Sequence, residues 1–421
     1  MAIQSRSPYL NVTLLIWLGL CSFNAYAYAG LSLKGVLDIQ SDWPVTDDGT
    51  SWTERGLNKQ LVDDSNAKLL RLGQAGLAAE YELTSTQHLK LNTLIYDEPE
   101  QGLAVTEAFW HFKPIPTSPW RSEWKLGAFY PPISLENRGV LWTSPYSISY
   151  SAINSWVAEE LRTFGLESNW RWRDAQRQDW KLFGAIFRHN DPAGSLLAWR
   201  GWAIHDRQYG INESIPFPDL MVFEDGEPLE NQARDNEPFL EVDQRWGFYA
   251  GLGREGRNLE WNLMAYNNNA DPSQITDGQY SWDTKFTSLS ARWRFGEHWE
   301  LLGQGMTGSS VMKNHYKVRV TDIDFDAAYV MLARSWHRQR LATRLEYFHV
   351  DDNDTLPYDD NNESGYSAML SYGYKLKNYP VKLIAEALHT RSDRPARRFM
   401  AQDEAITENK IAASVRYFWR L

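Results

Sequence analysis

The sequence contains very little cysteine, since Cys21 is the single one in 421 residues. Intramolecular disulfides are therefore excluded, and the fold must be stabilised by other interactions. The cysteine ends the stretch "LGLC", which loosely resembles the processing box of a lipid-anchored protein, but Leu20 is bulkier than such boxes normally allow. We expect Cys21 to be removed with an N-terminal signal, which leaves an exported chain without cysteine.

Long apolar runs are missing outside the N-terminus. There, Arg6 precedes the run "NVTLLIWLGLCSF", and small residues follow in A-x-A order at 25–27 or 27–29. This order is typical of a secretory signal peptide. An uncleaved membrane helix is the alternative, but the run is too short for a hydrocarbon core of about 30 Å. We predict a signal peptide over residues 1–29 and one exported domain over residues 30–421.

Basic residues are in the minority. The chain has 43 Lys and Arg against 54 Asp and Glu, so its formal net charge is -11, and removing Arg6 with the signal makes it -12. Such a balance argues against nucleic acid as a partner.

Aromatic residues, in contrast, are abundant. The chain has 20 Trp, 21 Tyr and 17 Phe, yet its mean hydropathy is only -0.52. A membrane-spanning β-barrel combines these features, because one face of each strand meets lipid, the other meets water, and aromatic belts mark both interfaces. A large secreted β-sandwich or propeller is the soluble alternative, since its strands also alternate.

Apolar and polar residues alternate in many segments, and the connections between these segments alternate in length. Seven short turns and eight long loops predict sixteen antiparallel strands in an up-and-down barrel, with the turns in the periplasm and the loops outside. We predict strands at 31–43, 67–83, 88–97, 102–113, 121–130, 162–172, 179–188, 243–254, 259–268, 282–294, 299–308, 325–336, 340–350, 364–375, 381–391 and 409–421.

One stretch resists this scheme. "LLAWRGWAIHDRQYG", residues 196–210, also looks like a strand, but counting it gives an odd total. We place it in the fourth long loop, 189–242, where it would fold into the lumen or cap the mouth. An eighteen-stranded barrel with one more hidden strand is the alternative.

The chain ends in "IAASVRYFWRL", which alternates to its last residue. In a barrel, this strand must pair with the first one, because no backbone group facing lipid can stay unpaired. It resembles the C-terminal recognition strand of bacterial outer-membrane proteins, although those usually end in Phe rather than Leu421. The resemblance implies the outer-membrane assembly machinery, outer-membrane lipid and lipopolysaccharide as partners.

The third long loop, residues 131–161, is unusually apolar and aromatic. We predict that it folds into the barrel and forms a constriction, on analogy with barrels whose lumen is narrowed by loops. An extracellular flap or a subunit contact is the alternative.

This part of the chain also carries a family resemblance. "WKLGAFYPPISLENRG", "SPYSI" and "AEELRTFGLE" look like the corresponding segment of phosphate-selective porins, with matches at Gly127, Pro131, Pro132, Arg162 and Gly165. The resemblance implies a trimeric porin of about sixteen strands, of general or anion-selective type. Phosphate selectivity is not carried over, because it needs several basic residues and Arg138 is the only one in the loop.

Mixed charges make up the candidate site. A mixed field across a narrow pore orients dipolar solutes and screens ions by sign, whereas an ordinary solvated loop is the alternative for each residue. The candidate constriction residues are Glu136, Arg138, Glu159, Glu160, Arg162, Arg200, His205, Asp206 and Arg207, and the candidate lumen-facing wall residues are Lys90, Arg344, Glu346 and Arg416.

Two other groups of loop residues, four tryptophans and an acidic loop, are interpreted without a ligand. Trp142, Trp156, Trp199 and Trp202 suit a sugar-stacking surface, but such residues more often pack a folded loop against the wall. The acidic loop 351–364 lacks the residue order of an EF-hand. We expect it to be solvated, in contact with lipopolysaccharide-bound divalent ions, and we predict no metal or cofactor.

The sequence therefore predicts a porin that forms a water-filled channel for passive diffusion of small hydrophilic solutes or ions. A plugged barrel that serves as an adhesin or scaffold is one alternative. An outer-membrane hydrolase is another, but no G-x-S-x-G or H-E-x-x-H motif is present and the nine histidines are scattered, so we expect no enzyme.

Overall fold

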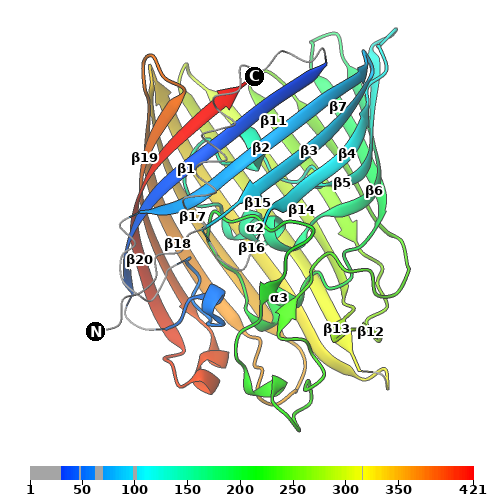
Figure 1. Ribbon diagram of the computed structural model, residues 1–421, viewed down its shortest axis with the longest axis vertical. Coiled ribbons are helices and arrows are strands. Elements are labelled where there is room, and N and C mark those ends of the chain that lie inside the picture. The colour runs from blue at the N-terminus through cyan, green and yellow to red at the C-terminus, as the bar shows by residue number, and fades with distance from the viewer. Residues whose placement is uncertain (1–29, 47–48, 62–69, 98–101, 315) are drawn as a thin grey trace.

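The chain forms a closed antiparallel β-barrel of sixteen strands, which confirms the predicted fold class (Figure 1). The computed structural model describes residues 30–46, 49–61, 70–97, 102–314 and 316–421, so the predicted signal peptide lies outside the described residues. The barrel strands are β1 (Leu31–Thr46), β2 (Arg71–Thr84), β3 (Gln87–Ile95), β4 (Ala104–Phe112), β5 (Trp120–Phe129), β6 (Thr163–Arg173), β7 (Asp179–Arg188), β10 (Gly247–Glu255), β11 (Leu259–Asn267), β14 (Asp283–Phe295), β15 (Trp299–Lys313), β16 (Arg319–Trp336), β17 (Gln339–Asp352), β18 (Glu363–Lys375), β19 (Val381–Asp393) and β20 (Ala405–Arg420).

The last strand closes the barrel against the first. β20 pairs with β1 in an antiparallel register that places Arg420 opposite Lys34. Beyond the strand, Leu421 N donates to Leu33 O at 2.9 Å, and Leu33 N donates to Leu421 O at 3.1 Å. The ladder is therefore continuous around the barrel, as a lipid environment requires.

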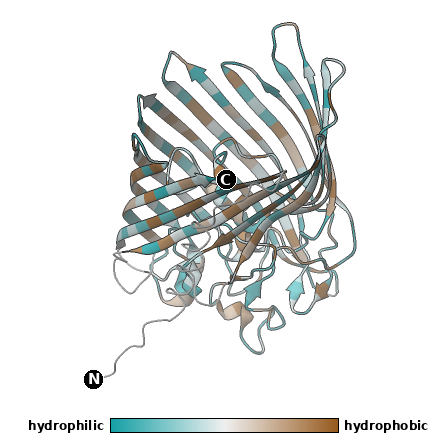
Figure 2. Cartoon of the chain, turned by 45° about the horizontal axis from the view of Figure 1, so that its top comes forward, coloured by the Kyte–Doolittle hydropathy of each residue, from teal (hydrophilic) through white to brown (hydrophobic). Residues whose placement is uncertain are grey.

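The two faces of the wall differ in chemistry, and hydropathy alternates along the strands (Figure 2). On β17, Leu341, Leu345 and Tyr347 are exposed, whereas the intervening Arg344 and Glu346 are buried. Since Arg344 contacts residues of a loop inside the barrel, the apolar set points outward. The outer face can thus meet lipid and the inner face is polar. Among the described residues, no helix is long and apolar enough to span a membrane.

The connections follow the predicted rhythm of short turns and long loops, with one correction. The sequence predicted a long loop over 309–324, but β15 runs on to Lys313 and β16 begins at Arg319. The strands extend because their alternation continues: inward-facing Met312 and Ile323 are both buried. These two strands therefore stand out beyond their neighbours.

The long loops contain the remaining elements, and much of this material lies within the barrel (Figure 1). Trp156 and Trp202, both fully buried, pack against inward-facing Phe325, with ring centroids 5.5 and 6.0 Å apart. The core of the protein thus lies between loops and inner wall. The loop elements are η1 (Trp52–Glu54), η2 (Val140–Trp142), α2 (Ala152–Glu160), α3 (Ser195–Trp199), β8 (Ile215–Pro216), η3 (Met221–Phe223), β9 (Asp235–Asn236), β12 (Ile275–Thr276), β13 (Gln279–Tyr280) and η4 (Pro395–Met400).

The stretch 196–210, which the sequence analysis left outside the wall, adds no barrel strand. Its first residues belong to the short helix α3, and Ile204 forms an isolated parallel bridge with Gln60 of the first long loop. Trp199, Trp202 and Ile204 are fully buried. The wall accordingly keeps sixteen strands rather than eighteen.

Candidate functional site

The segment between β5 and β6 crosses the barrel interior. It contains α2, which begins after the N-cap Ser151, whose side chain accepts a hydrogen bond from Asn154 N. This cap satisfies a free backbone donor of the first turn. All nine residues of α2 are buried, so the helix is enclosed by other loops and by the wall. The sequence analysis did not predict this helix.

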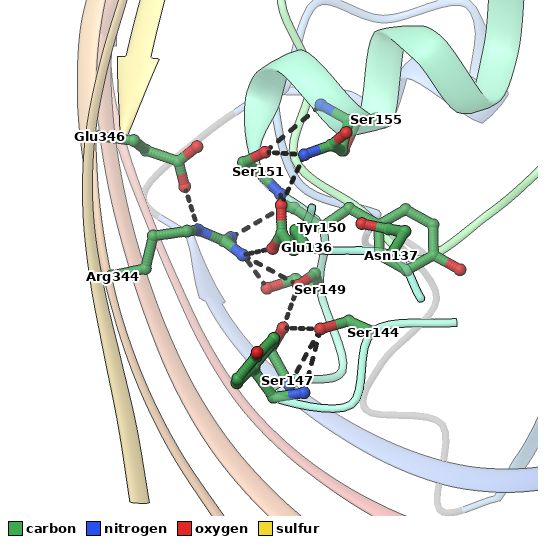
Figure 3. A network of polar contacts seen from close by, with 12 residues as sticks. Glu136, Asn137, Ser144, Ser147, Ser149, Tyr150, Ser151, Ser155, Arg344 and Glu346 are labelled. Carbon is green, nitrogen blue, oxygen red and sulfur yellow. Dashed lines mark hydrogen bonds and ion pairs between the residues drawn. The ribbon is translucent and has the colours of Figure 1, made fainter. Parts of the chain in front are cut away.

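Arg344 of β17 ties this segment to the wall (Figure 3). Its Nη1 lies 2.7 Å from Glu136 Oε1, and its Nε donates to Glu346 Oε1 at 3.0 Å. The guanidinium also donates to the backbone oxygens of Ser149 and Tyr150. One buried cation therefore pairs with two carboxylates and fixes a turn of the loop, since a charged group taken out of water needs such partners.

Carboxylates of other strands hold the same loop through its backbone. Glu386 of β19 accepts hydrogen bonds from Ile148 N at 2.6 Å and Ser149 N at 3.0 Å. Tyr146 donates to Glu300 of β15 at 2.7 Å. The loop is therefore attached at several points around the inner wall.

Arg138 is the candidate charge of this loop that remains accessible to water. It forms two hydrogen bonds with Glu260 of β11, one of them at 2.9 Å, and 32% of its side chain is exposed. Arg292 Nη2 lies 2.6 Å and Lys181 Nζ 3.7 Å from the same carboxylate. Lys181 Nζ lies closer to a second carboxylate, that of Glu255, at 2.8 Å. The cluster therefore has three basic and two acidic side chains, which leaves a net positive charge.

Glu159, Arg200 and His205 form a fully buried group. Arg200 binds the carboxylate of Glu159 through two hydrogen bonds at 2.6 and 2.7 Å, and His205 Nε2 lies 2.9 Å from it. Although burial raises the pKa of Glu159, the contacts with Arg200 and His205 outweigh it and lower that pKa to about 2. The group joins α2 to the loop that follows α3.

Glu160, Asp206 and Arg207 are also buried. Glu160 accepts hydrogen bonds from Gly194 N and Leu196 N at the start of α3. Asp206 accepts from Gln40 Nε2 of β1 at 2.7 Å. Arg207 lies over the rings of Tyr96 and Tyr209, as the cation–π geometry allows.

Three of the residues that carry the family resemblance, Arg162, Gly165 and Gly127, have structural roles here. Arg162 is fully buried and donates to five backbone oxygens, including Thr106 O at 3.0 Å and Tyr209 O at 2.8 Å. At Gly165 an added Cβ would overlap Ile186 O of the neighbouring strand. Gly127 has a φ of 134°, which side chains rarely allow. This corner of the barrel therefore needs these residue types for packing.

The predicted wall residues lie on the inner faces of β3, β17 and β20. Arg416 is buried and pairs with Asp38 of β1 at 2.8 Å. Lys90 lies 3.4 Å from Glu80, and 27% of its side chain is exposed. Arg344 and Glu346 belong to the network described above. A pore-lining role of the wall and constriction candidates stays a prediction.

Water reaches the inner wall mainly toward the end that carries the short turns. There, charged inward-facing side chains are partly exposed: 28% for Glu123, 29% for Arg171 and 26% for Arg340. Toward the long-loop end, inward-facing Phe187, Phe325 and other residues are buried by the loops. The interior is therefore open on one side and densely packed on the other.

Sequence reasoning missed several of these residues. Glu260, Arg292 and Lys181 complete the cluster of Arg138, and Glu386 anchors the loop. All four occupy inward-facing positions of strands. The alternation of polar and apolar residues in the sequence could therefore have identified them as facing the interior. It does not indicate which inward charges meet a loop, because that depends on contacts between distant segments.

Comparison with known proteins supports the fold. No protein-family model and no curated sequence matches the chain. The outer membrane channel DcaP of Acinetobacter baumannii is 9% identical with a TM-score of 0.54, and 93% of this chain matches 99% of that one. The OmpT protein of Vibrio cholerae with loop L8 deleted is 11% identical with a TM-score of 0.53, covering 93% and 100% of the two chains. The chain is therefore similar in fold to outer-membrane channels of Gram-negative bacteria.

Proposed function

We propose that the chain is an outer-membrane porin, in which small hydrophilic solutes or ions diffuse passively through a water-filled lumen. The observation that carries the proposal is a closed barrel with an apolar outer face and charged, partly exposed side chains on its inner face. Charged side chains are rarely placed in a dry protein core. Lys90 and Arg171 lie inside the barrel and are partly exposed to water, which indicates a hydrated lumen. The short turns would lie in the periplasm.

The segment 131–161 would narrow this channel, with the cluster around Glu260 at its edge. Because three basic side chains, Arg138, Arg292 and Lys181, face two carboxylates, those of Glu260 and Glu255, the local net charge is positive although the whole chain has a net charge of -11. Ion preference follows the charge at the narrowest point. The channel should therefore prefer anions, and the buried candidate charges, Glu159 among them, would hold the loops in place.

Reversal potentials in a salt gradient test this proposal. Purified protein in planar bilayers should give stable conductance steps and a reversal potential on the anion-selective side. Replacing Arg138 with Gln should lower the anion-to-cation permeability ratio at least twofold, because it removes one exposed cation from the cluster. Arg319→Gln is the matched control, since Arg319 lies at the long-loop end and 64% of its side chain is exposed.

A plugged barrel is the second candidate, and the packed loop core favours it. Fully buried Trp156, Trp199 and Trp202 fill part of the interior. Repeated membrane insertion without current would support this alternative and contradict the porin proposal. An unchanged reversal potential in Arg138→Gln would leave a channel but remove this residue from its narrow part.

Phosphate selectivity and a homotrimer have weaker support. The sequence resemblance to phosphate-selective porins suggests a trimer, and we propose it on that basis alone. The segment 131–161 has one basic residue, Arg138, so a specific phosphate site is not part of the proposal. Cross-linking in mild detergent would test the trimer.

A further inference from the structure

The connection between β17 and β18 gathers three carboxylates. One oxygen each of Asp352, Asp354 and Asp359 lie within 4.8 Å of one another. Two oxygens that bind the same Ca²⁺ at 2.3–2.6 Å are separated by at most about 5 Å. The spacing therefore suits a single ion of this size.

The loop backbone shapes this group. Asp352 accepts hydrogen bonds from Asp354 N and Asn361 N, and Asp354 accepts from Leu356 N and from Asp322 N of β16. These backbone hydrogen bonds hold Asp352 and Asp354 in fixed positions but supply no positive charge. Among the described residues, no Lys, Arg or His side chain forms a hydrogen bond or ion pair with any of the three.

Two buried oxygen atoms at this group have no hydrogen-bond partner. Asp359 is fully buried, and its Oδ1 has none, while Oδ2 accepts from Asn361 Nδ2 at 3.0 Å. Asn361 is also fully buried, and its Oδ1 has no partner either. A buried oxygen without a partner is unfavourable. The three carboxylates, including that of Asp359, and the amide oxygen of Asn361 together form a set of hard oxygen ligands.

Among the described residues, no ion pair joins the neighbouring cation to these carboxylates. The neighbouring cation Arg394 instead donates to the backbone oxygens of Ala198 at 2.7 Å and Asn361 at 3.3 Å. Its Nη1 also lies 3.9 Å from Glu363, so its direct contacts are with groups other than the three carboxylates.

We propose that Asp352, Asp354, Asp359 and the amide oxygen of Asn361 bind a divalent cation of the Ca²⁺ class. Partly exposed Asp352 and Asp354 give the ion access from the long-loop end. The ion would tie the end of β17 to the loop before β18. The sequence analysis expected a solvated loop here, because residue order does not show that Asp359 and Asn361 are buried.

Terbium luminescence tests this site. The full-length protein, purified in detergent free of lipopolysaccharide and treated with EDTA, should sensitise Tb³⁺ through adjacent Tyr358. Calcium chloride should displace the signal with half-saturation between about 10⁻⁴ and 10⁻³ M, as in extracellular Ca²⁺ modules. Asp359→Asn should weaken Ca²⁺ binding at least tenfold.

Asp360→Asn is the matched control, because Asp360 pairs with Arg398 and lies outside the three-carboxylate group. Calcium should raise the Tm of the wild type and of this control but not that of Asp359→Asn. Should Asp359→Asn fold poorly, Asp354→Asn replaces it in both measurements. Equal Ca²⁺ affinity in Asp359→Asn and Asp360→Asn, or no saturable signal in the wild type, would overturn the proposal.

Discussion

At the scale of single residues, most charged side chains predicted to line a pore are buried in ion pairs. Glu136 and Glu159 are fully buried, and each has an arginine partner at 2.6–2.7 Å. A buried pair is not necessarily stabilising relative to apolar residues, but removing one partner leaves an uncompensated charge. These residues should therefore affect the attachment of the loops more than ion flow.

Replacing Arg344 with Met tests this view. The variant leaves Glu136 and Glu346 without their cation, so the free energy of unfolding should fall by about 3–5 kcal/mol. Urea unfolding in lipid vesicles measures this change. Exposed Arg319, replaced with Gln, should change it by less than about 1 kcal/mol. Equal effects of the two substitutions would contradict the anchoring role.

Acid should weaken the group around Glu159. Its carboxyl pKa is lowered to about 2 in the folded chain, against about 4.3 in an unfolded one. Its stabilisation is therefore complete above pH 4.3 and is lost as the pH falls toward 2, and about 3 kcal/mol is at stake. Thermal melts between pH 6 and pH 2.5 should show a smaller loss in Glu159→Gln than in the wild type. An equal loss of thermal stability with falling pH in Glu159→Gln and the wild type would contradict this role of Glu159.

At the scale of elements, strands were predictable and loop helices were not. Alternation depends on neighbours two residues apart, so it marked β17 within two residues at each end. The helix α2 lacks a solvent-exposed face, since all nine of its residues, polar ones included, are buried. Its surroundings come from distant loops and strands, which sequence periodicity does not reveal. The loop charges were identified, but their partners, such as Glu260 and Glu386, depend on the same long-range contacts.

The pairing of β6 with β7 depends on a small residue at Gly165. Replacing it with Ala would force a Cβ against Ile186 O, and the neighbouring backbone has little freedom to move. We expect the folded fraction to fall at least fivefold, as measured by heat-modifiable migration on gels. Gly305→Ala is the control, because nothing lies within 4 Å of its added Cβ. Equal folding of both variants would mean that the strands separate easily.

At the scale of the whole molecule, the outer surface is apolar, in contrast to the surface of a protein that is dissolved in water. Leu345 is 64% exposed and Val330 is 56% exposed, both pointing away from the interior. Such exposure is costly in water and favourable in lipid. The sequence therefore specifies a protein that is stable as a cylinder within a membrane.

Arginine substitutions measure how the barrel sits in lipid. Leu345→Arg, in the middle of β17, should cost about 2–4 kcal/mol of unfolding free energy, as for barrel positions at the bilayer midplane. Val318→Arg, in the exposed connection between β15 and β16, should cost at most about 1 kcal/mol. Equal costs in vesicle-based urea titrations would contradict the lipid-facing orientation.

The uneven filling of the interior makes the two directions of passage inequivalent. A solute arriving from the short-turn end meets hydrated charges such as Glu123 and Arg171 before any narrowing, whereas one arriving from the opposite side first encounters folded loops. Under one polarity, an electric field draws ions into the open short-turn end. Under the opposite polarity, it draws them against the folded loops at the other end. Oriented single channels should consequently rectify, with unequal currents at voltages of equal size and opposite sign.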